Sequence, residues 1–210
     1  MSFKQLEEII CACGENFESE LYQSVTVRDD PDLKDLILAG ELNLVKCPSC
    51  FRVFYAERFV LYHDFSQELM AFIYPQSMES KKEEMRIKMD LIFAQLQSGL
   101  SKDESLSYPP RLFFGLETLC DLLNLEEALQ DEAVVVLALC KHLKLNSQKI
   151  RRDLARTRGI PPLLPLESIS KDFRKNLLAG LKKILKVNDR LVSYQQLLSQ
   201  VESSPDWTLR

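Results

Sequence analysis

The chain has 210 residues, of which 46% are hydrophobic and 28% charged, so disordered, collagen-like and disulfide-scaffold classes are excluded. It offers no apolar run of roughly 18 residues to span a membrane, and its first ten residues do not resemble a signal peptide. The formal net charge of −4 conceals a gradient. Residues 1–75 carry 6 basic and 13 acidic residues, whereas residues 151–210 carry 12 and 6. We expect a cytoplasmic protein of one or two domains.

The first third of the chain predicts a small sheet with one inserted helix. Residues 17–27 alternate apolar and polar side chains, as a half-buried strand does. Pro31 and Gly40 are placed to begin and end a short helix between them. Further extended segments are expected at residues 42–46, 52–62 and 68–75.

The middle of the chain is predicted to be helical. Residues 79–98 carry apolar side chains at helical spacing, with charged residues on the other side. After a connector and the short apolar run 111–114, two helices are expected at 115–124 and 126–143. We expect the chain to break between them near Asn124.

The last part of the chain is predicted to be helical with one interruption. A helix is expected over roughly residues 146–157. Gly159 and three prolines then mark a hinge or linker near residues 159–165. Two further helices follow, the first with apolar residues at helical spacing from Phe173 and the second from about 189 to 202.

These elements together predict an α+β protein. A small antiparallel sheet of the zinc-ribbon type, with an inserted helix, is followed by a mostly helical C-terminal region. The expected domains are residues 1–145 and a helical extension of residues 146–210, which contains the proline-rich linker.

Four of the six cysteines form two close pairs, Cys11 with Cys13 and Cys47 with Cys50, separated by 33 residues. This pattern is typical of a tetrahedral thiolate site, because two tight turns can each present two sulfurs to one zinc ion. We therefore predict a structural Zn²⁺ site, with iron as an alternative ion because it also accepts tetrahedral sulfur. The other cysteines lie among apolar helix-forming residues and are predicted to belong to the core: Cys120 and Cys140.

The residues beside the pairs indicate tight turns. Pro48 fixes φ inside the second pair and removes a competing donor. Gly14 follows the first pair, at a position where such a turn often has positive φ, and Phe51 occupies the matching position after the second pair. In many such turns backbone N–H groups point at the sulfurs.

Two other uses of these cysteines are open. A redox dithiol at Cys47 and Cys50 would need a helix N-terminus to lower a thiol pKa, but the residues that follow indicate a strand. A catalytic zinc site could be built from Cys13, Cys47, Cys50 and His63, with Cys11 left out. Since His63 stands at the end of a predicted strand beside an aspartate, a structural histidine is favoured.

The residues around the cysteines resemble the bacterial CpXC family. They read C-x-C-G-x-x-F-E-x-E, then Q-S-V-x-V, then G-E-L-N-L-V-K-C-P-S-C and V-L-Y-H-D. The resemblance covers roughly residues 8–75 and continues more weakly to about residue 143. At the first pair this chain has C-A-C in place of C-P-x-C. The resemblance implies metal binding by Cys11, Cys13, Cys47 and Cys50, and it implies no activity.

The sequence favours a role without catalysis. It has no glycine-rich phosphate loop, no H-E-x-x-H and no G-x-S-x-G, and four thiolates leave a zinc ion no open position. We predict an interaction module that binds a protein partner or a second copy of itself. One alternative is nucleic-acid binding through Arg151–Arg158 and Lys171–Lys186, which the acidic first third disfavours. The other alternative is a thiol redox protein.

Overall fold

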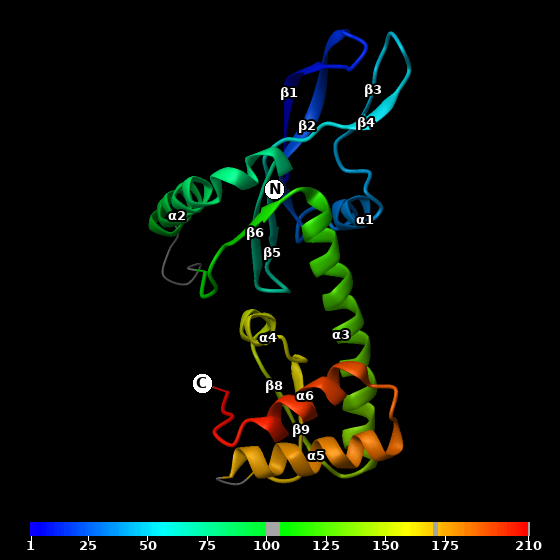
Figure 1. Cartoon of the computed structure of the whole chain (residues 1–210), viewed down its shortest axis with the longest axis vertical. Coiled ribbons are helices and arrows are strands. Elements are labelled where there is room, and N and C mark those ends of the chain that lie inside the picture. The colour runs from blue at the N-terminus through cyan, green and yellow to red at the C-terminus, as the bar shows by residue number, and fades with distance from the viewer. Residues whose placement is uncertain (100–105, 170–171, 210) are drawn as a thin grey trace. The chain divides into compact units, whose positions relative to one another are not determined.

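The computed structural model describes residues 1–99, 106–169 and 172–209 (Figure 1). The chain divides into two compact units, Met1–Asn124 and Leu125–Arg210. Both contain helices and strands, so the predicted α+β class is confirmed. None of the described helices combines the length and apolar character needed to cross a membrane.

Unit 1 is built around a five-stranded sheet with the strand order β1-β2-β5-β6-β7. The β1–β2 and β5–β6 pairs are antiparallel, whereas β2–β5 and β6–β7 are parallel. The sheet is therefore mixed, and not wholly antiparallel as expected, because two long crossovers return the chain in the same direction. The strands are β1 (Phe3–Ile10), β2 (Asn16–Thr26), β5 (Val60–Asp64), β6 (Leu69–Tyr74) and β7 (Arg111–Phe114).

Both faces of this sheet are covered by helices. On one face Tyr62 and Ala71 pack with the inserted helix α1 (Asp32–Leu38) and with the first turns of α3 (Leu116–His142). On the other face Met70 and Phe72 pack with Met85 and Met89 of α2, and every residue of β6 is consequently buried. Helix α2 (Lys82–Gly99) follows the short 3-10 helix η1 (Gln76–Lys81).

A separate hairpin carries the second cysteine pair. Its strands are β3 (Leu44–Lys46) and β4 (Val53–Tyr55), which pair with each other and not with the main sheet. Val45 of this hairpin packs with Ile9 and Leu21 from the β1–β2 hairpin. This small apolar cluster holds the two hairpins together.

Unit 2 has its own core and its own two-stranded sheet. Leu164, Leu181 and Tyr194 are among its fully buried residues, and the Tyr194 hydroxyl donates a 2.9 Å hydrogen bond to the carbonyl of Leu163. Besides the last part of α3, its elements are β8 (Asn146–Lys149), α4 (Arg152–Arg158), β9 (Leu163–Leu166), α5 (Phe173–Val187) and α6 (Val192–Ser203).

Three predictions for the second half of the chain are wrong. Helix α3 continues through Asn124, because an asparagine in a helix costs less than about 1 kcal/mol, which the packing of its apolar residues outweighs. The helix expected over 146–157 is instead strand β8 followed by α4. The segment expected as a linker near 159–165 is buried from residue 160 onward and leads into β9. The division into a domain of residues 1–145 and an extension of residues 146–210 stays a prediction.

Candidate metal centre

The first cysteine pair lies in the turn of the β1–β2 hairpin. Cys11 directly follows Ile10, the last residue of β1, and Cys13 lies two residues further on. The turn is closed by two backbone hydrogen bonds of 2.8 Å, one donated by Cys11 to the carbonyl of Glu15 and one donated by Gly14 to the carbonyl of Cys11. Gly14 has a φ of 93°, so the positive φ expected after this pair is confirmed.

The second pair lies in the turn of the β3–β4 hairpin and has the same design. Cys47 donates a 2.9 Å backbone hydrogen bond to Arg52, and Phe51 donates one of 3.0 Å back to Cys47. The backbone N–H of Cys50 points at the sulfur of Cys47 from 3.5 Å. Phe51 has a φ of 60°, a conformation that a side chain with a Cβ adopts only at a cost.

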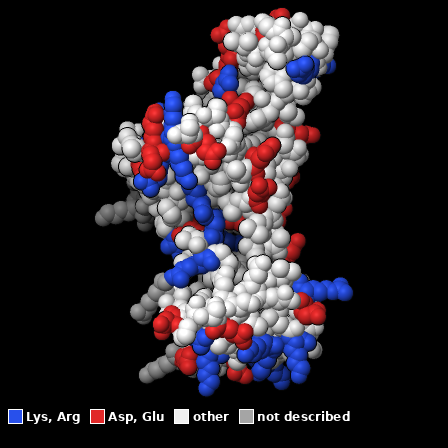
Figure 2. All heavy atoms as spheres, in the orientation of Figure 1, with Lys and Arg blue, Asp and Glu red and all other residues white. Residues whose placement is uncertain are grey.

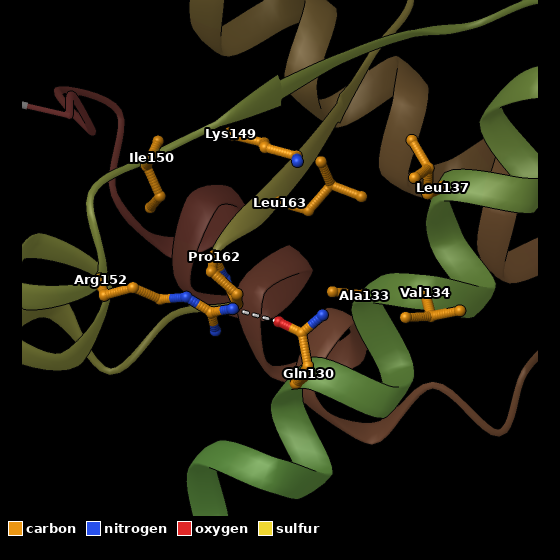
Figure 3. Close-up of a pocket in the computed structure, with 9 residues that line it drawn as sticks. All are labelled: Gln130, Ala133, Val134, Leu137, Lys149, Ile150, Arg152, Pro162 and Leu163. Carbon is orange, nitrogen blue, oxygen red and sulfur yellow. Dashed lines mark hydrogen bonds between the residues drawn. The ribbon is translucent and has the colours of Figure 1, made fainter. Parts of the chain in front are cut away.

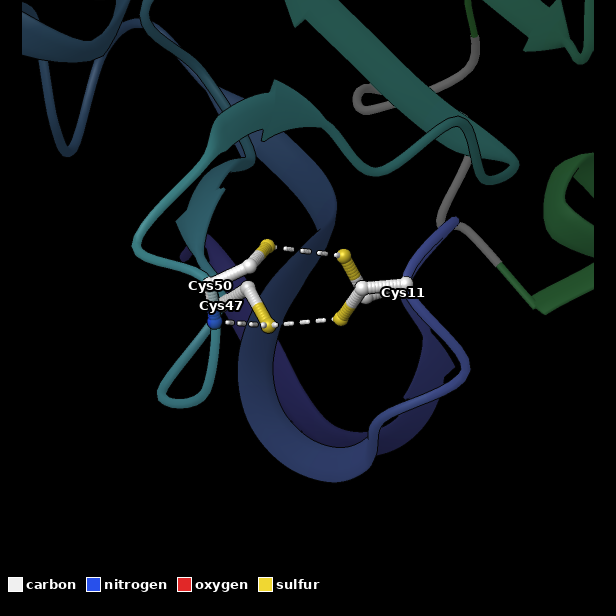
Figure 4. A group of neighbouring side chains, drawn as sticks. Cys11, Cys47 and Cys50 are labelled. Carbon is white, nitrogen blue, oxygen red and sulfur yellow. Dashed lines mark hydrogen bonds between the residues drawn. The ribbon is translucent and has the colours of Figure 1, made fainter.

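The two turns meet so that all four sulfurs lie within 4.8 Å of one another (Figure 4). The Sγ atoms of Cys11 and Cys50 are 3.6 Å apart, and those of Cys13 and Cys47 are 3.7 Å apart. Zinc–sulfur bonds of about 2.3 Å at tetrahedral angles would place sulfurs about 3.8 Å apart. The donor set and its spacing therefore fit one tetrahedral metal ion, and the cluster could hold one.

Each pair contributes one buried and one exposed cysteine. Cys11 and Cys47 are enclosed by the protein, whereas Cys13 and Cys50 are exposed. The sulfur cluster is consequently covered by the protein at Cys11 and Cys47 and reachable from solvent at Cys13 and Cys50. An ion could enter such a site without unfolding of the surrounding chain.

The thiols differ in their acidity. Burial raises the pKa of Cys47, but the backbone N–H groups of Cys50 and Ser49 and the neighbouring thiols outweigh it and lower the pKa to about 7. At Cys11 a backbone N–H of Cys13 lowers the pKa, while burial and the other three thiols together raise it to about 12. Cys47 therefore loses its proton more readily than Cys11, and coordination of a cation by the protonated thiols must release protons.

The other residues considered from the sequence lie outside this cluster. His63 does not belong to the cluster of four cysteines. Its Nε2 instead forms a 2.7 Å hydrogen bond with the hydroxyl of Tyr108. Burial lowers the pKa of His63 to about 4. Cys140 is buried in the core of unit 2 as predicted, while Cys120 is half-buried and donates a hydrogen bond to the carbonyl of Ile37.

Two residues that sequence reasoning missed hold the hairpins in place. The side-chain amide of Asn43 accepts a 2.8 Å hydrogen bond from the N–H of Tyr22 and donates one of 3.1 Å to its carbonyl, which ties the start of the β3–β4 hairpin to β2. Arg58 contacts the carboxylate of Glu7 and the carbonyl of Glu8 in β1. Neither residue shows a local sequence signal, because their partners are far away in the chain.

The fold and the cluster define an α+β protein with a four-cysteine group able to hold a metal ion. The chain belongs to the CpXC protein family, whose family model matches residues 9–138 and thereby includes all four cysteines. Comparison with curated proteins and with solved structures gave no match. The resemblance predicted from the cysteine motifs is confirmed.

Proposed function

We propose that the protein binds one structural Zn²⁺ ion through Cys11, Cys13, Cys47 and Cys50. The observation that supports this most directly is the approach of four sulfurs from two hairpins to the spacing of a tetrahedral thiolate site. With four thiolate ligands the ion has no open position for a substrate, so its role is to fasten the two hairpins. Zinc is preferred over iron because it is the commoner occupant of structural sites.

We propose further that the fastened β3–β4 hairpin presents a surface for another protein. This hairpin tip comprises Leu44, Lys46, Phe51, Arg52 and Val53. Phe51 is 67% exposed, Val53 57% and Leu44 42%. The register pairs Lys46 with Val53, and the ammonium of Lys46 lies 5.4 Å from the ring centre of Phe51. Lys46 is therefore next to two exposed apolar side chains, Phe51 and Val53.

The chemistry of the hairpin tip points to an acidic protein segment with apolar side chains. The chain from Leu42 to Tyr55 contains two cations and no carboxylate, although the first third of the protein is strongly acidic. Phe51 occupies a left-handed backbone position and buries little of its ring, so its packing within the chain does not offset that strain. An apolar side chain of a partner could cover the ring while partner carboxylates approach Lys46 and Arg52.

The metal proposal is tested by elemental analysis of the purified protein. We expect one zinc per chain in the wild type and a loss of bound metal in Cys13→Ser and Cys47→Ser. Cys120→Ser is the matched control, since a hydroxyl can keep the hydrogen bond to Ile37. Detection of iron in place of zinc would change the identity of the proposed ion and leave the site itself supported. Absence of any metal, with all three variants equally stable, would refute the site.

The partner proposal is tested by selection from a displayed random-peptide library against the metal-loaded protein. We expect enrichment of peptides that combine Asp or Glu with aliphatic or aromatic residues. Phe51→Ser and Lys46→Glu should abolish their binding. Leu91→Ser is the control, because Leu91 is 61% exposed on α2, away from the hairpin. No enrichment, or equal binding to Phe51→Ser, would refute this surface.

Nucleic-acid binding by the basic C-terminal region ranks lower. Lys and Arg gather over α5 in Figure 2, but several cations of the proposed strip already have carboxylate partners. Lys182 pairs with Glu202 and Lys183 with Glu167, and Arg156 pairs with a glutamate of α3. Lys171 lies outside the described residues. Salt-sensitive retention on a nucleic-acid column that charge reversal abolishes would restore this alternative.

A thiol redox role also ranks lower. The sulfur contacts of 3.6 and 3.7 Å join one cysteine pair to the other, as a shared metal ion requires. That motif lies in a turn between two strands, where no helix N-terminus is available to stabilise a thiolate. Metal-free protein whose activity changes on reduction would favour it. Cytoplasmic location stays a prediction.

A further inference from the structure

Unit 2 contains a cavity of about 260 Å³ between α3, β8, α4 and the segment that enters β9 (Figure 3). Much of its wall is apolar and comes from buried or half-buried side chains, including Ala133, Leu137 and Leu163. Its polar groups are an amide, Gln130, and two cations, Lys149 and Arg152. None of the described residues that line it has a carboxylate.

The two cations are held on a defined backbone. Lys149 is paired with Leu163 in the β8–β9 ladder, and the N–H of Ile150 donates a 3.0 Å hydrogen bond to the carbonyl of Pro162. The guanidinium of Arg152 reaches the side-chain oxygen of Gln130 (Figure 3). Within the described part of the chain neither Lys149 nor Arg152 forms an ion pair, so both side chains are available to an anion.

We propose that this cavity binds a small monocarboxylate with an apolar body. An arginine and a lysine that face an apolar space without a carboxylate are suited to the planar anionic group of such a ligand, and Arg152 retains N–H donors beyond the one used by Gln130. At about 30 Å³ per water-sized group the space admits roughly nine non-hydrogen atoms. The apolar wall would cover the rest of the ligand.

The test is calorimetric titration of the full-length protein with benzoate, which has the required size. Benzamide supplies the same shape without charge, and inorganic phosphate supplies charge without an apolar body. We expect saturable binding of benzoate, with benzamide and phosphate each at least about tenfold weaker, since charge-assisted hydrogen bonds and apolar burial both contribute. Equal binding of benzoate and benzamide would overturn the proposal.

Variants locate the binding. Arg152→Gln should raise the benzoate Kd about tenfold or more, whereas Arg190→Gln, an exposed arginine elsewhere in unit 2, should leave it unchanged. Val134→Trp should block the cavity without altering charge, and its neighbour Val135→Trp is the matched control because Val135 does not line the cavity. No benzoate binding up to about 10 mM, or unchanged binding in both Arg152→Gln and Val134→Trp, would overturn the site.

Discussion

Gly180 of α5 lies so close to the backbone of Pro165 in β9 that a methyl group on its Cα would come within 2.4 Å of the Pro165 carbonyl oxygen. This contact lets the helix pack directly against the strand in the core of unit 2. Gly180→Ala should therefore lower the free energy of unfolding. We expect a net loss of at least about 1 kcal/mol, because the steric cost of overpacking exceeds the gain in helix propensity.

Urea unfolding of both proteins measures this difference. Gly99→Ala is the matched control, since a Cβ at Gly99 of α2 meets nothing within 4 Å. That variant should be as stable as the wild type or slightly more stable. If Gly180→Ala were as stable as Gly99→Ala, the close approach of α5 to β9 would be contradicted.

Removal of the proposed ion by a chelator should loosen the two cysteine hairpins first. Without an ion, the turns at Cys11–Glu15 and Cys47–Arg52 keep their own backbone hydrogen bonds, the small apolar cluster and the contacts of Asn43 and Arg58, but nothing ties the two tips to each other through the sulfurs. Hydrogen–deuterium exchange should become faster at the amides of Cys47 and Phe51. The amides of β6, which is buried on both faces, should keep their protection. Unchanged exchange at Cys47 and Phe51 would argue against a structural ion.

Phe51→Gly should be more stable than Phe51→Ala by about 1 kcal/mol. Both substitutions remove the exposed ring, but only glycine adopts a φ of 60° without a steric cost. Thermal or urea unfolding of the metal-loaded variants measures the difference. The same pair at Val53, which lies in a strand, should show the reverse order, because glycine weakens a strand. Equal stability of the two Phe51 variants would remove the argument that this residue is strained.

His63 should make the protein less stable in mild acid. Burial, opposed by Asp64, lowers the pKa of His63 from 6.5 to about 4. Between these two pH values the unfolded chain binds a proton at His63 and the folded chain does not. The contribution of neutral His63 is intact above pH 6.5 and is lost as the pH falls from there to about 4. Discounted for partial exposure, it amounts to about 1–2 kcal/mol.

Urea midpoints at about pH 7.5 and pH 5, compared between the wild type and His63→Gln, isolate this effect. Glutamine does not titrate, whereas acid effects on the four thiolates are common to both proteins. The drop in midpoint should therefore be smaller in His63→Gln. An equal drop in both proteins would show that His63 is as easily protonated in the folded chain as in the unfolded one.

The sequence predictions that succeeded were based on residues that lie close together in the chain. The two cysteine turns were predictable because each is a local structure, closed by hydrogen bonds between residues close in the chain. Gly14 and Phe51 have the positive φ that such turns require. The helices α2, α5 and α6 follow from apolar residues that recur within one element. The expectation that the two turns meet rested on one argument, that a single metal ion takes four sulfur ligands.

Contacts between distant residues decided the rest. β1 was missed because its apolar residues Phe3, Leu6 and Ile9 recur every third residue, whereas a strand is recognised by alternation at every second residue. This segment is a strand because it pairs with β2. β8 and β9 were misjudged because each becomes a strand only through the antiparallel ladder that it forms with the other. The amino-acid sequence by itself thus determined the cysteine turns and the amphipathic helices, whose causes are local. Only the tertiary structure decided the mixed sheet, the β8–β9 ladder and the cavity beside it. The reason is that the local sequence of a strand does not specify which distant segment it pairs with.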